Sequence, residues 1–257
     1  MNTQWIYRRP SPAARLRLFC LPYAGGGSSI YSRWQGELPE DIEVCAVELP
    51  GRRARLREPP IRRATALVEA IAEGVAPYLD LPFVFFGHSM GALLAFELAL
   101  YLRRVGRQGP RALFLSAAAA PHLPRSRKLL WRLGDAEFLS EIRGYGGTPE
   151  EVFSEPGLLA LFLPVLRADF EVFDTYEYED DGPLDCPLHV YGGRDDERAT
   201  PGQLRAWGEL ASNLESVELF PGGHFYLHEQ RPALTAAITR ELASVVPGRA
   251  GGRGGER

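Results

Sequence analysis

The sequence has 257 residues, of which 45% are apolar and 24% are charged, and its formal net charge is −4 at pH 7. This length and composition are typical of a globular protein with a large buried core. The acidic balance argues against nucleic acid as the main partner, and no apolar stretch is long enough to span a bilayer. We therefore expect neither a nucleic-acid nor a membrane partner, and the short apolar run near the N-terminus is not a signal peptide.

Strand-like and helix-like segments alternate along the chain. Helical periodicity occupies residues 64–79 and 92–105, and a short helix is expected near Trp34. Apolar strand patterns are predicted at residues 15–23, 43–49, 83–86, 112–119, 187–191 and 216–220. Strands that alternate with helices predict a mostly parallel, doubly wound α/β sheet.

Residues 121–183 interrupt this alternation, because they carry helical patterns only. An insertion at this place predicts a helical lid over the carboxyl edge of the sheet, where open α/β sheets bind ligands. Most of its apolar residues belong to a core, but a second apolar face would suit an acyl chain, with Phe162 and Leu163 as candidates. We expect one domain over residues 1–246 and a disordered Gly/Arg-rich tail at 247–257.

The cysteines indicate a reducing environment. Cys20, Cys45 and Cys186 are odd in number and lack the spacing of metal ligands. Two of them lie inside apolar strand patterns, which favours buried reduced thiols over disulfides. A cytoplasmic location is the expectation that follows.

Residues 87–91 read Gly-His-Ser-Met-Gly and lie between an apolar strand and a long apolar helix. This is the nucleophile-elbow pattern, in which the serine occupies a sharp strand-to-helix turn. Its two glycines leave room for the turn because they carry no Cβ atom. The pattern predicts Ser89 as the nucleophile, with the helix dipole and the Met90 N–H group facing any negative charge that forms there. The alternative is a chance match, against which the flanking strand and helix argue.

A histidine and an aspartate complete the expected chemistry, because serine is a weak nucleophile without an adjacent base. His224 follows the last predicted strand in a tight turn, where the chain order Ser…Asp/Glu…His places the base. The acid should follow the preceding strand, where Asp195 and Asp196 are both candidates, and the turn pattern alone does not choose between them. The competing histidines are less well placed: His88, His122, His189 and His228.

The Gly-rich turn at residues 22–26 follows the first strand and is expected to supply a second oxyanion donor. Our candidate is the Ala24 N–H group, paired with that of Met90, and the alternative is an ordinary Gly-rich turn. We interpret the arginines at 52, 53, 55 and 57, and those at 103, 104 and 107, as solvated surface. A role for them in docking an acidic partner is the competing interpretation.

With these residues assembled, the sequence resembles the type II thioesterases associated with polyketide synthases and non-ribosomal peptide synthetases. The resemblance extends from Leu18 to about Gln230. It rests on motifs in a matching order: residues 20–26 (CLPYAGG), 49–52 (LPGR), 57–59 (REP), 87–91 (GHSMG), 146–150 (GGTPE), 166–170 (LRADF) and 221–225 (PGGHF).

This resemblance implies a free-standing α/β-hydrolase that cleaves acyl thioesters from the phosphopantetheine arm of an acyl or peptidyl carrier protein. Its implied role is to clear stalled or wrongly primed acyl groups, through a Ser89–His224–Asp196 triad and without a metal or bound cofactor. The resemblance favours Asp196 over Asp195, since Ala199 and Trp207 then have the family's spacing from the acid. We expect a monomer.

Two other classes of function remain open at this point. A carboxylester hydrolase or an acyltransferase would use the same triad. A hydrolase-like protein without catalytic activity would bind a ligand only, although the intact set of serine, acid and histidine argues against it.

Overall fold

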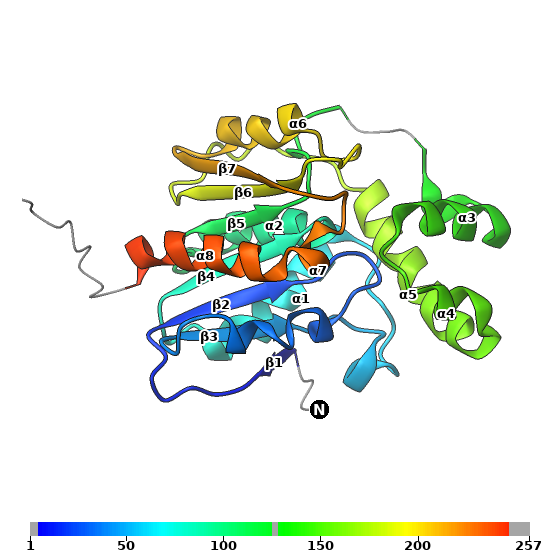
Figure 1. The fold of residues 1–257 in the computed structure, drawn as a ribbon, viewed down its shortest axis with the longest axis horizontal. Helices are drawn as coiled ribbons and strands as arrows, with labels where there is room; N and C mark the ends of the chain where they lie inside the picture. Colours follow the sequence, from blue (N-terminus) through cyan, green and yellow to red (C-terminus); the bar gives the residue numbers. More distant parts are fainter. Residues whose placement is uncertain (1–4, 125–127, 247–257) are drawn as a thin grey trace, which may run out of the picture.

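The computed structural model describes residues 5–124 and 128–246, and the tail at 247–257 lies outside them. In these residues, seven strands form one sheet in the order β1-β3-β2-β4-β5-β6-β7 (Figure 1). Strand β1 pairs antiparallel with β3, and every other pair of neighbours is parallel. The strands are β1 (Ile6–Arg8), β2 (Leu16–Leu21), β3 (Ile42–Val47), β4 (Phe83–His88), β5 (Leu113–Ser116), β6 (Leu188–Gly193) and β7 (Leu214–Phe220). The predicted mostly parallel α/β sheet is therefore confirmed.

Strand β1 is absent from the strands predicted from the sequence. It is three residues long and lies at the edge of the sheet, where Ile6 pairs with Val47. So short a strand carries too little period-two alternation to be recognised. The six predicted strands are all present, with their ends within three residues of the expected positions.

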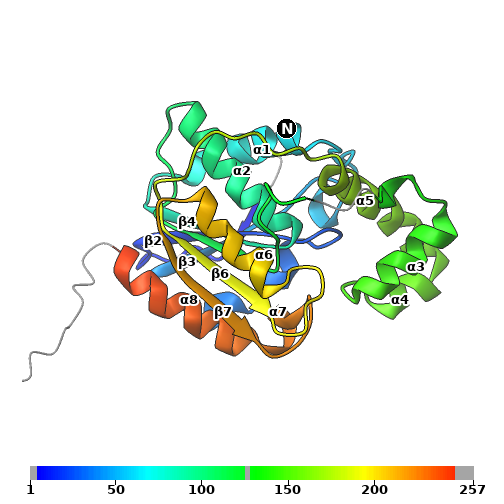
Figure 2. The ribbon, with the colours of Figure 1, turned by 90° about the horizontal axis from the view of Figure 1, so that it is seen from above.

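Helices cover both faces of the sheet (Figure 2). One buried cluster contains residues of α1 (Ala64–Val75), α2 (Met90–Arg104) and α6 (Pro201–Arg205). The other contains residues of α7 (Tyr226–Glu229) and α8 (Arg231–Val245), together with the 3₁₀ turn that carries Trp34. Because both faces are covered, β2, β3, β4 and β5 are buried at every position, which is why they are continuous apolar runs.

The chain between β5 and β6 contains α3 (Asp135–Tyr145), α4 (Glu150–Ser154) and α5 (Pro156–Asp174). These three helices stand together beyond one end of the sheet (Figures 1 and 2). They enclose a small apolar core of their own, made of Leu130, Phe138, Ile142, Leu166 and Phe170. The insertion thus packs on itself and also places α5 next to the carboxyl ends of the strands.

Two further sequence expectations can be compared with the described residues. Cys20, Cys45 and Cys186 are free thiols, the first two buried. None of the helices described has the length and apolar character needed to cross a membrane.

Candidate active site

Ser89 lies between β4 and α2 in a strained backbone conformation, with φ 55° and ψ −118°. Such a conformation costs about 1–3 kcal/mol in a residue other than glycine. The glycines on either side allow close packing: a Cβ atom on Gly87 would lie 2.0 Å from the Gly91 carbonyl oxygen, and one on Gly91 would lie 2.2 Å from that of Leu21. The positive φ falls on the serine itself, so the glycines provide space while Ser89 takes the strain.

His224 joins Ser89 to Asp196 through its two ring nitrogens. Its Nε2 lies 3.0 Å from the Ser89 Oγ, and its Nδ1 lies 2.8 Å from the Asp196 Oδ2. His224 belongs to the tight turn after β7, and Asp196 follows β6, as the chain order predicts. The Asp196 side chain is fully buried, whereas Asp195 is exposed. The structure therefore brings Ser89, His224 and Asp196 together and leaves Asp195 outside the group.

Asp196 is held in place by backbone donors as well as by the histidine. Its Oδ1 accepts hydrogen bonds from the N–H groups of Arg198, at 2.9 Å, and Ala199, at 3.3 Å. Burial acts to raise the pKa of Asp196, but the hydrogen bond from His224 and the two backbone donors outweigh it and lower the pKa below its ordinary value. The carboxylate is therefore ionised and can fix the His224 tautomer with the proton on Nδ1.

The residues that carry the two expected oxyanion donors line the same cavity as the serine. Helix α2 begins at Met90, so the Met90 N–H group has no carbonyl partner within the helix. Ala24 lies in the turn after β2, where the Gly26 N–H donates to the Tyr23 carbonyl oxygen at 2.9 Å. Ala24 and Met90 line the same cavity as Ser89 and His224.

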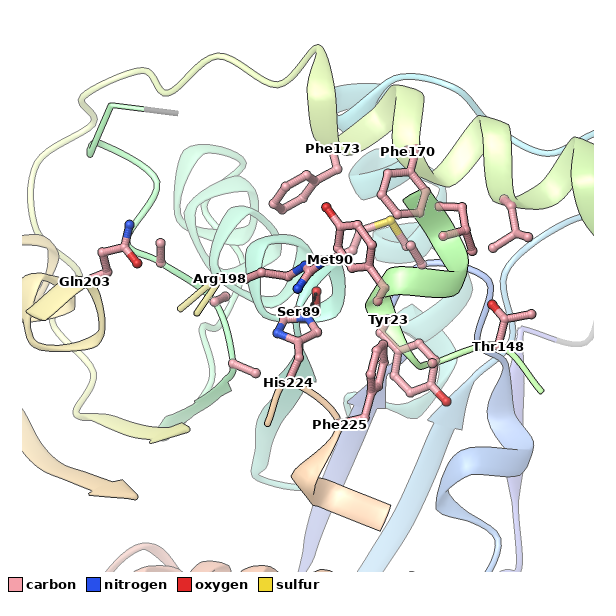
Figure 3. A pocket seen from close by; sticks show the side chains of 18 of the residues that line it. Tyr23, Ser89, Met90, Thr148, Phe170, Phe173, Arg198, Gln203, His224 and Phe225 are labelled. Carbon is pink, nitrogen blue, oxygen red and sulfur yellow. Dashed lines mark hydrogen bonds between the residues drawn. The ribbon is translucent and has the colours of Figure 1, made fainter. Parts of the chain in front are cut away.

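That cavity has a volume of about 320 Å³ (Figure 3). Phe170 and Phe173 of α5 lie across the cavity from His224. Its other apolar walls come from α3 and from the small residues after β5, and the side chains involved include Ala118, Ala119, Leu123, Ile142, Tyr145 and Leu166. The Arg198 guanidinium stacks on the Tyr145 ring at 3.8 Å. The lining suits an elongated apolar group next to Ser89.

Phe162 and Leu163 are not part of that lining, so the structure does not place them at the wall of the cavity that contains Ser89. They lie one to two turns earlier on α5, where Phe162 is 37% exposed and Leu163 packs against the core of the insertion. The helix presents Leu166, Phe170 and Phe173 to the cavity instead.

A second groove, of about 400 Å³, adjoins the catalytic cavity and shares Tyr23, Gly147 and Thr148 with it. Leu56, Leu161 and Phe162 line this groove and are among the few large apolar side chains that the described residues expose. Arg53 also lines it, and its side chain is 49% exposed. The site thus has two adjoining compartments, one that contains Ser89 and His224 and one that carries Arg53.

The structure corrects the interpretation of the basic residues near this groove. Arg52 and Arg55 are 8% and 4% exposed, and so they are buried rather than solvated. Arg52 pairs with the buried Asp169 of α5, and Arg55 pairs with Glu58 and packs over the Trp5 ring. Charged groups are buried only with such partners.

Beneath the elbow lies a buried polar chain that sequence reasoning did not identify. The His88 Nδ1 is 2.8 Å from the Ser116 Oγ, which is 2.7 Å from the Tyr226 hydroxyl. Burial, together with His224 and His228, lowers the pKa of His88 well below its ordinary value, so this ring is neutral. The centroid of the His88 ring lies 5.5 Å from that of the His224 ring, so His88 packs against the catalytic base.

His228 has a structural partner. The Tyr23 hydroxyl lies 3.0 Å from the His228 Nε2, and the Tyr23 ring packs edge-on against Phe225. Burial raises the pKa of Tyr23 to about 12. Among the residues that the structure describes, no cluster of three or more His, Cys, Asp or Glu side chains is arranged to hold a metal ion.

The comparisons with known proteins agree with one another. A sequence model of the thioesterase domain matches residues 16–242. The gramicidin S biosynthesis protein GrsT of Aneurinibacillus migulanus is 39% identical over 246 residues, which are 96% of each chain. RedJ, a thioesterase from the prodiginine biosynthetic pathway in Streptomyces coelicolor, has a similar structure, with a TM-score of 0.83 and 38% identity over 90% of this chain and 87% of RedJ.

YbtT, a type II thioesterase from the yersiniabactin biosynthetic pathway, matches with a TM-score of 0.84 and 32% identity, over 94% of this chain and 99% of YbtT. These similarities confirm the α/β-hydrolase fold and the resemblance found in the sequence. They extend over the sheet, the elbow and the helical insertion alike. The chain therefore belongs to the thioesterase family.

Proposed function

We propose that this protein is a serine thioesterase that hydrolyses acyl groups from the phosphopantetheine arm of carrier proteins and so clears aberrant acyl groups from a polyketide or non-ribosomal peptide synthase. One observation carries the proposal: a Ser89–His224–Asp196 hydrogen-bonded chain opens into an apolar cavity in a member of the thioesterase family. The relatives from gramicidin S and yersiniabactin biosynthesis support the choice of substrate class.

The reaction proceeds in two acyl transfers. His224 Nε2 takes the proton of the Ser89 hydroxyl as Oγ bonds to the thioester carbonyl carbon, and the N–H groups of Ala24 and Met90 hold the resulting oxyanion. When the tetrahedral intermediate collapses, the C–S bond breaks and the proton on His224 passes to the leaving sulfur, so the thiol departs and His224 is again a neutral base. A water molecule then gives a proton to His224 as it attacks the acyl-serine, and collapse of the second intermediate returns that proton to the Ser89 Oγ and releases the carboxylic acid.

The two compartments divide a thioester substrate between them. The apolar cavity receives the acyl chain, since it contains Ser89 and is lined by Phe170, Phe173 and Ile142. The second groove receives the pantetheine arm, because it is continuous with the cavity and carries Arg53. Arg53 pairs with Glu48 through its Nε at 3.4 Å, and its half-exposed guanidinium keeps other N–H donors for the phosphodiester, whereas Arg198 at the cavity is stacked on Tyr145.

The remaining features of the proposal concern organisation. Residues 1–246 form one domain in which the helical insertion at about 121–183 serves as a lid over the site, and the protein acts in the cytoplasm as a monomer. Light scattering during size-exclusion chromatography tests the last point, since a monomer has a mass of 28.5 kDa.

The decisive experiment compares turnover of an acyl-carrier thioester with turnover of an oxygen ester of equal chain length, with intact protein mass as the readout. The thioester should be hydrolysed far faster, and Ser89→Ala should fold normally but lose activity by roughly 10⁴-fold or more, without an acyl adduct. Faster turnover of the oxygen ester would indicate a carboxylester hydrolase. Transfer of the acyl group to an added thiol or amine in preference to water would indicate an acyltransferase. Failure of a fluorophosphonate to label Ser89 would mean that the protein binds ligands without catalysis.

A further inference from the structure

We propose that Arg52 and Asp169 are positioning residues that hold the Ala24 N–H group in the oxyanion hole and couple it to helix α5. The inference rests on the proposed function, because it assigns a task to two residues that do not themselves touch the reacting atoms. Neither residue lines the cavity that contains Ser89.

The two side chains form a buried, two-point ion pair. Arg52 Nη2 donates to Asp169 Oδ1 at 2.9 Å, and Arg52 Nη1 donates to Asp169 Oδ2 at 3.0 Å. Arg52 is 8% exposed and Asp169 is 1% exposed. Asp169 lies among the buried residues of α5, which are apolar except for Asp169 itself and Glu171. A charge in such a place is costly unless it has a specific partner.

The pair has further hydrogen bonds, and these go to the turn that contains Ala24. The Gly25 N–H donates to Asp169 Oδ2 at 2.7 Å, and Arg52 Nη1 donates to the Gly26 carbonyl oxygen at 2.6 Å. The ion pair therefore binds the N–H group of Gly25 and the carbonyl oxygen of Gly26, which is the next residue. Rotation of either peptide plane would break a charge-assisted hydrogen bond.

The turn itself closes through a single backbone hydrogen bond. This bond joins the Gly26 N–H to the Tyr23 carbonyl oxygen, and Gly25 has φ +76°, which is the conformation that a type II turn requires at its third residue. Glycine at this position adds backbone freedom, and Ala24 directly precedes it. The ion pair removes that freedom, and so fixes the direction of the Ala24 N–H bond.

Helix α5 also contacts the turn directly. A Cβ atom on Gly25 would lie 2.5 Å from Leu166 Cδ2, so the helix packs tightly against this glycine. Leu166 and Phe170, on either side of Asp169 along α5, both line the acyl cavity. A single helix therefore forms the wall of the cavity and also holds the turn that binds the oxyanion.

The test is Asp169→Asn. If the new amide nitrogen takes the place of Oδ1, the hydrogen bond from Arg52 Nη2 is lost and the two nitrogen groups repel; if it takes the place of Oδ2, the hydrogen bonds from the Gly25 N–H and Arg52 Nη1 are both lost. Loss of a whole oxyanion donor lowers kcat by about 10²–10³-fold, so a displaced donor should lower kcat by roughly 10- to 100-fold, with KM for an acyl-N-acetylcysteamine thioester changed by less than about 3-fold.

A second readout does not depend on the substrate. Ser89 displaces fluoride from a fluorophosphonate, and the phosphoryl oxygen gains negative charge in the same oxyanion hole during this attack, so the labelling rate should fall in parallel with kcat. If the wild type labels but hydrolyses no thioester, the proposed function fails, while the labelling rates still test the positioning role.

The chain offers a matched control in Glu43, at the start of β3. Glu43 is 1% exposed, accepts from the buried Arg17 at 2.9 Å and accepts a backbone N–H from Ser11 at 2.9 Å. This group lies at the opposite end of the same strands, away from Ser89. Glu43→Gln should lower the thermal midpoint by a similar amount and leave kcat within about 2-fold of wild type.

A double variant separates positioning from folding. Arg52→Gln combined with Asp169→Asn leaves no buried charge unpaired, so the thermal midpoint should recover in part while kcat and the labelling rate stay low. Recovery of kcat together with the thermal midpoint would overturn the proposal. So would equal losses of kcat in Asp169→Asn and Glu43→Gln, or wild-type labelling of Ser89 in Asp169→Asn.

Discussion

Asp196→Asn should inactivate the protein through the tautomer of His224 rather than through its position. In the wild type, Asp196 Oδ1 accepts the N–H groups of Arg198 and Ala199, and Oδ2 faces His224 Nδ1. An asparagine at this position has one oxygen. Because the two backbone groups are donors, they attract that oxygen and leave the amide N–H₂ group facing the histidine.

His224 Nδ1 must then accept a hydrogen bond, which places the ring proton on Nε2. That nitrogen lies 3.0 Å from the Ser89 Oγ and can no longer take its proton. The same change in a serine protease lowers kcat by about 10⁴-fold, which corresponds to about 5.5 kcal/mol in the activation barrier. We expect a loss of this size here, since the Asp196 side chain is fully buried and no water can substitute for it.

Hydrolysis of an acyl-N-acetylcysteamine thioester, followed through the released thiol, measures the effect. Asp195→Asn is the matched control, because it makes the same chemical change one residue away at an exposed position, and it should stay within a few-fold of wild type. A larger loss from Asp195→Asn than from Asp196→Asn would refute the assignment. An Asp196→Asn variant within about 10-fold of wild type would refute the tautomer argument.

Three other outcomes are expected. Ala119→Phe should raise KM for decanoyl but not acetyl thioesters, because excluding two methylenes from the cavity costs about 1.6 kcal/mol, or roughly 15-fold; an equal rise for both would place the chain elsewhere. Arg53→Glu should raise KM for acyl-CoA by roughly 3- to 10-fold and leave that for acyl-pantetheine, which lacks the phosphate, unchanged. Burial lowers the pKa of His88, so below about pH 6.5 the unfolded chain binds a proton that the folded protein does not. The free energy of unfolding should therefore fall by up to about 1.4 kcal/mol for each pH unit below that value. Urea titrations at pH 5 and pH 7 should show a smaller difference in stability for His88→Gln than for the wild type.

Sequence patterns were enough to identify the catalytic residues whose positions are set by the neighbouring stretch of chain. Ser89 is marked by a strand, two glycines and a helix that are adjacent in the sequence, and His224 by a tight turn after a strand. The choice between Asp195 and Asp196 is different, because it depends on how the chain after β6 turns towards His224. Only the resemblance favoured Asp196, and the hydrogen bond to His224 is a tertiary contact over 28 positions of the sequence.

The ion pair of Arg52 and Asp169 was even harder to predict from local sequence patterns. These residues are 117 positions apart, and each was noted in a motif without a reason to connect them. A signal did exist: an aspartate on the apolar face of a helix needs a buried cation, and Arg52 lies beside a Gly-rich turn. The lid residues that line the cavity were not identified for a related reason, since periodicity identifies the apolar face of α5 but not which turn of the helix lies over Ser89.

For engineers who wish to change the acyl selectivity of this protein, the walls of the cavity are not equivalent. Replacing Leu166 or Phe170 would shift α5, and with it the hydrogen bond from Gly25 to Asp169, so a larger or smaller pocket would come with a slower reaction. Ala119 and Leu123 line the same cavity from the segment after β5 and lie outside the core that Leu166 and Phe170 share. Libraries restricted to that wall should yield variants that prefer a new acyl chain length and keep the native turnover rate. Selection from them would change substrate binding without changing the catalytic rate.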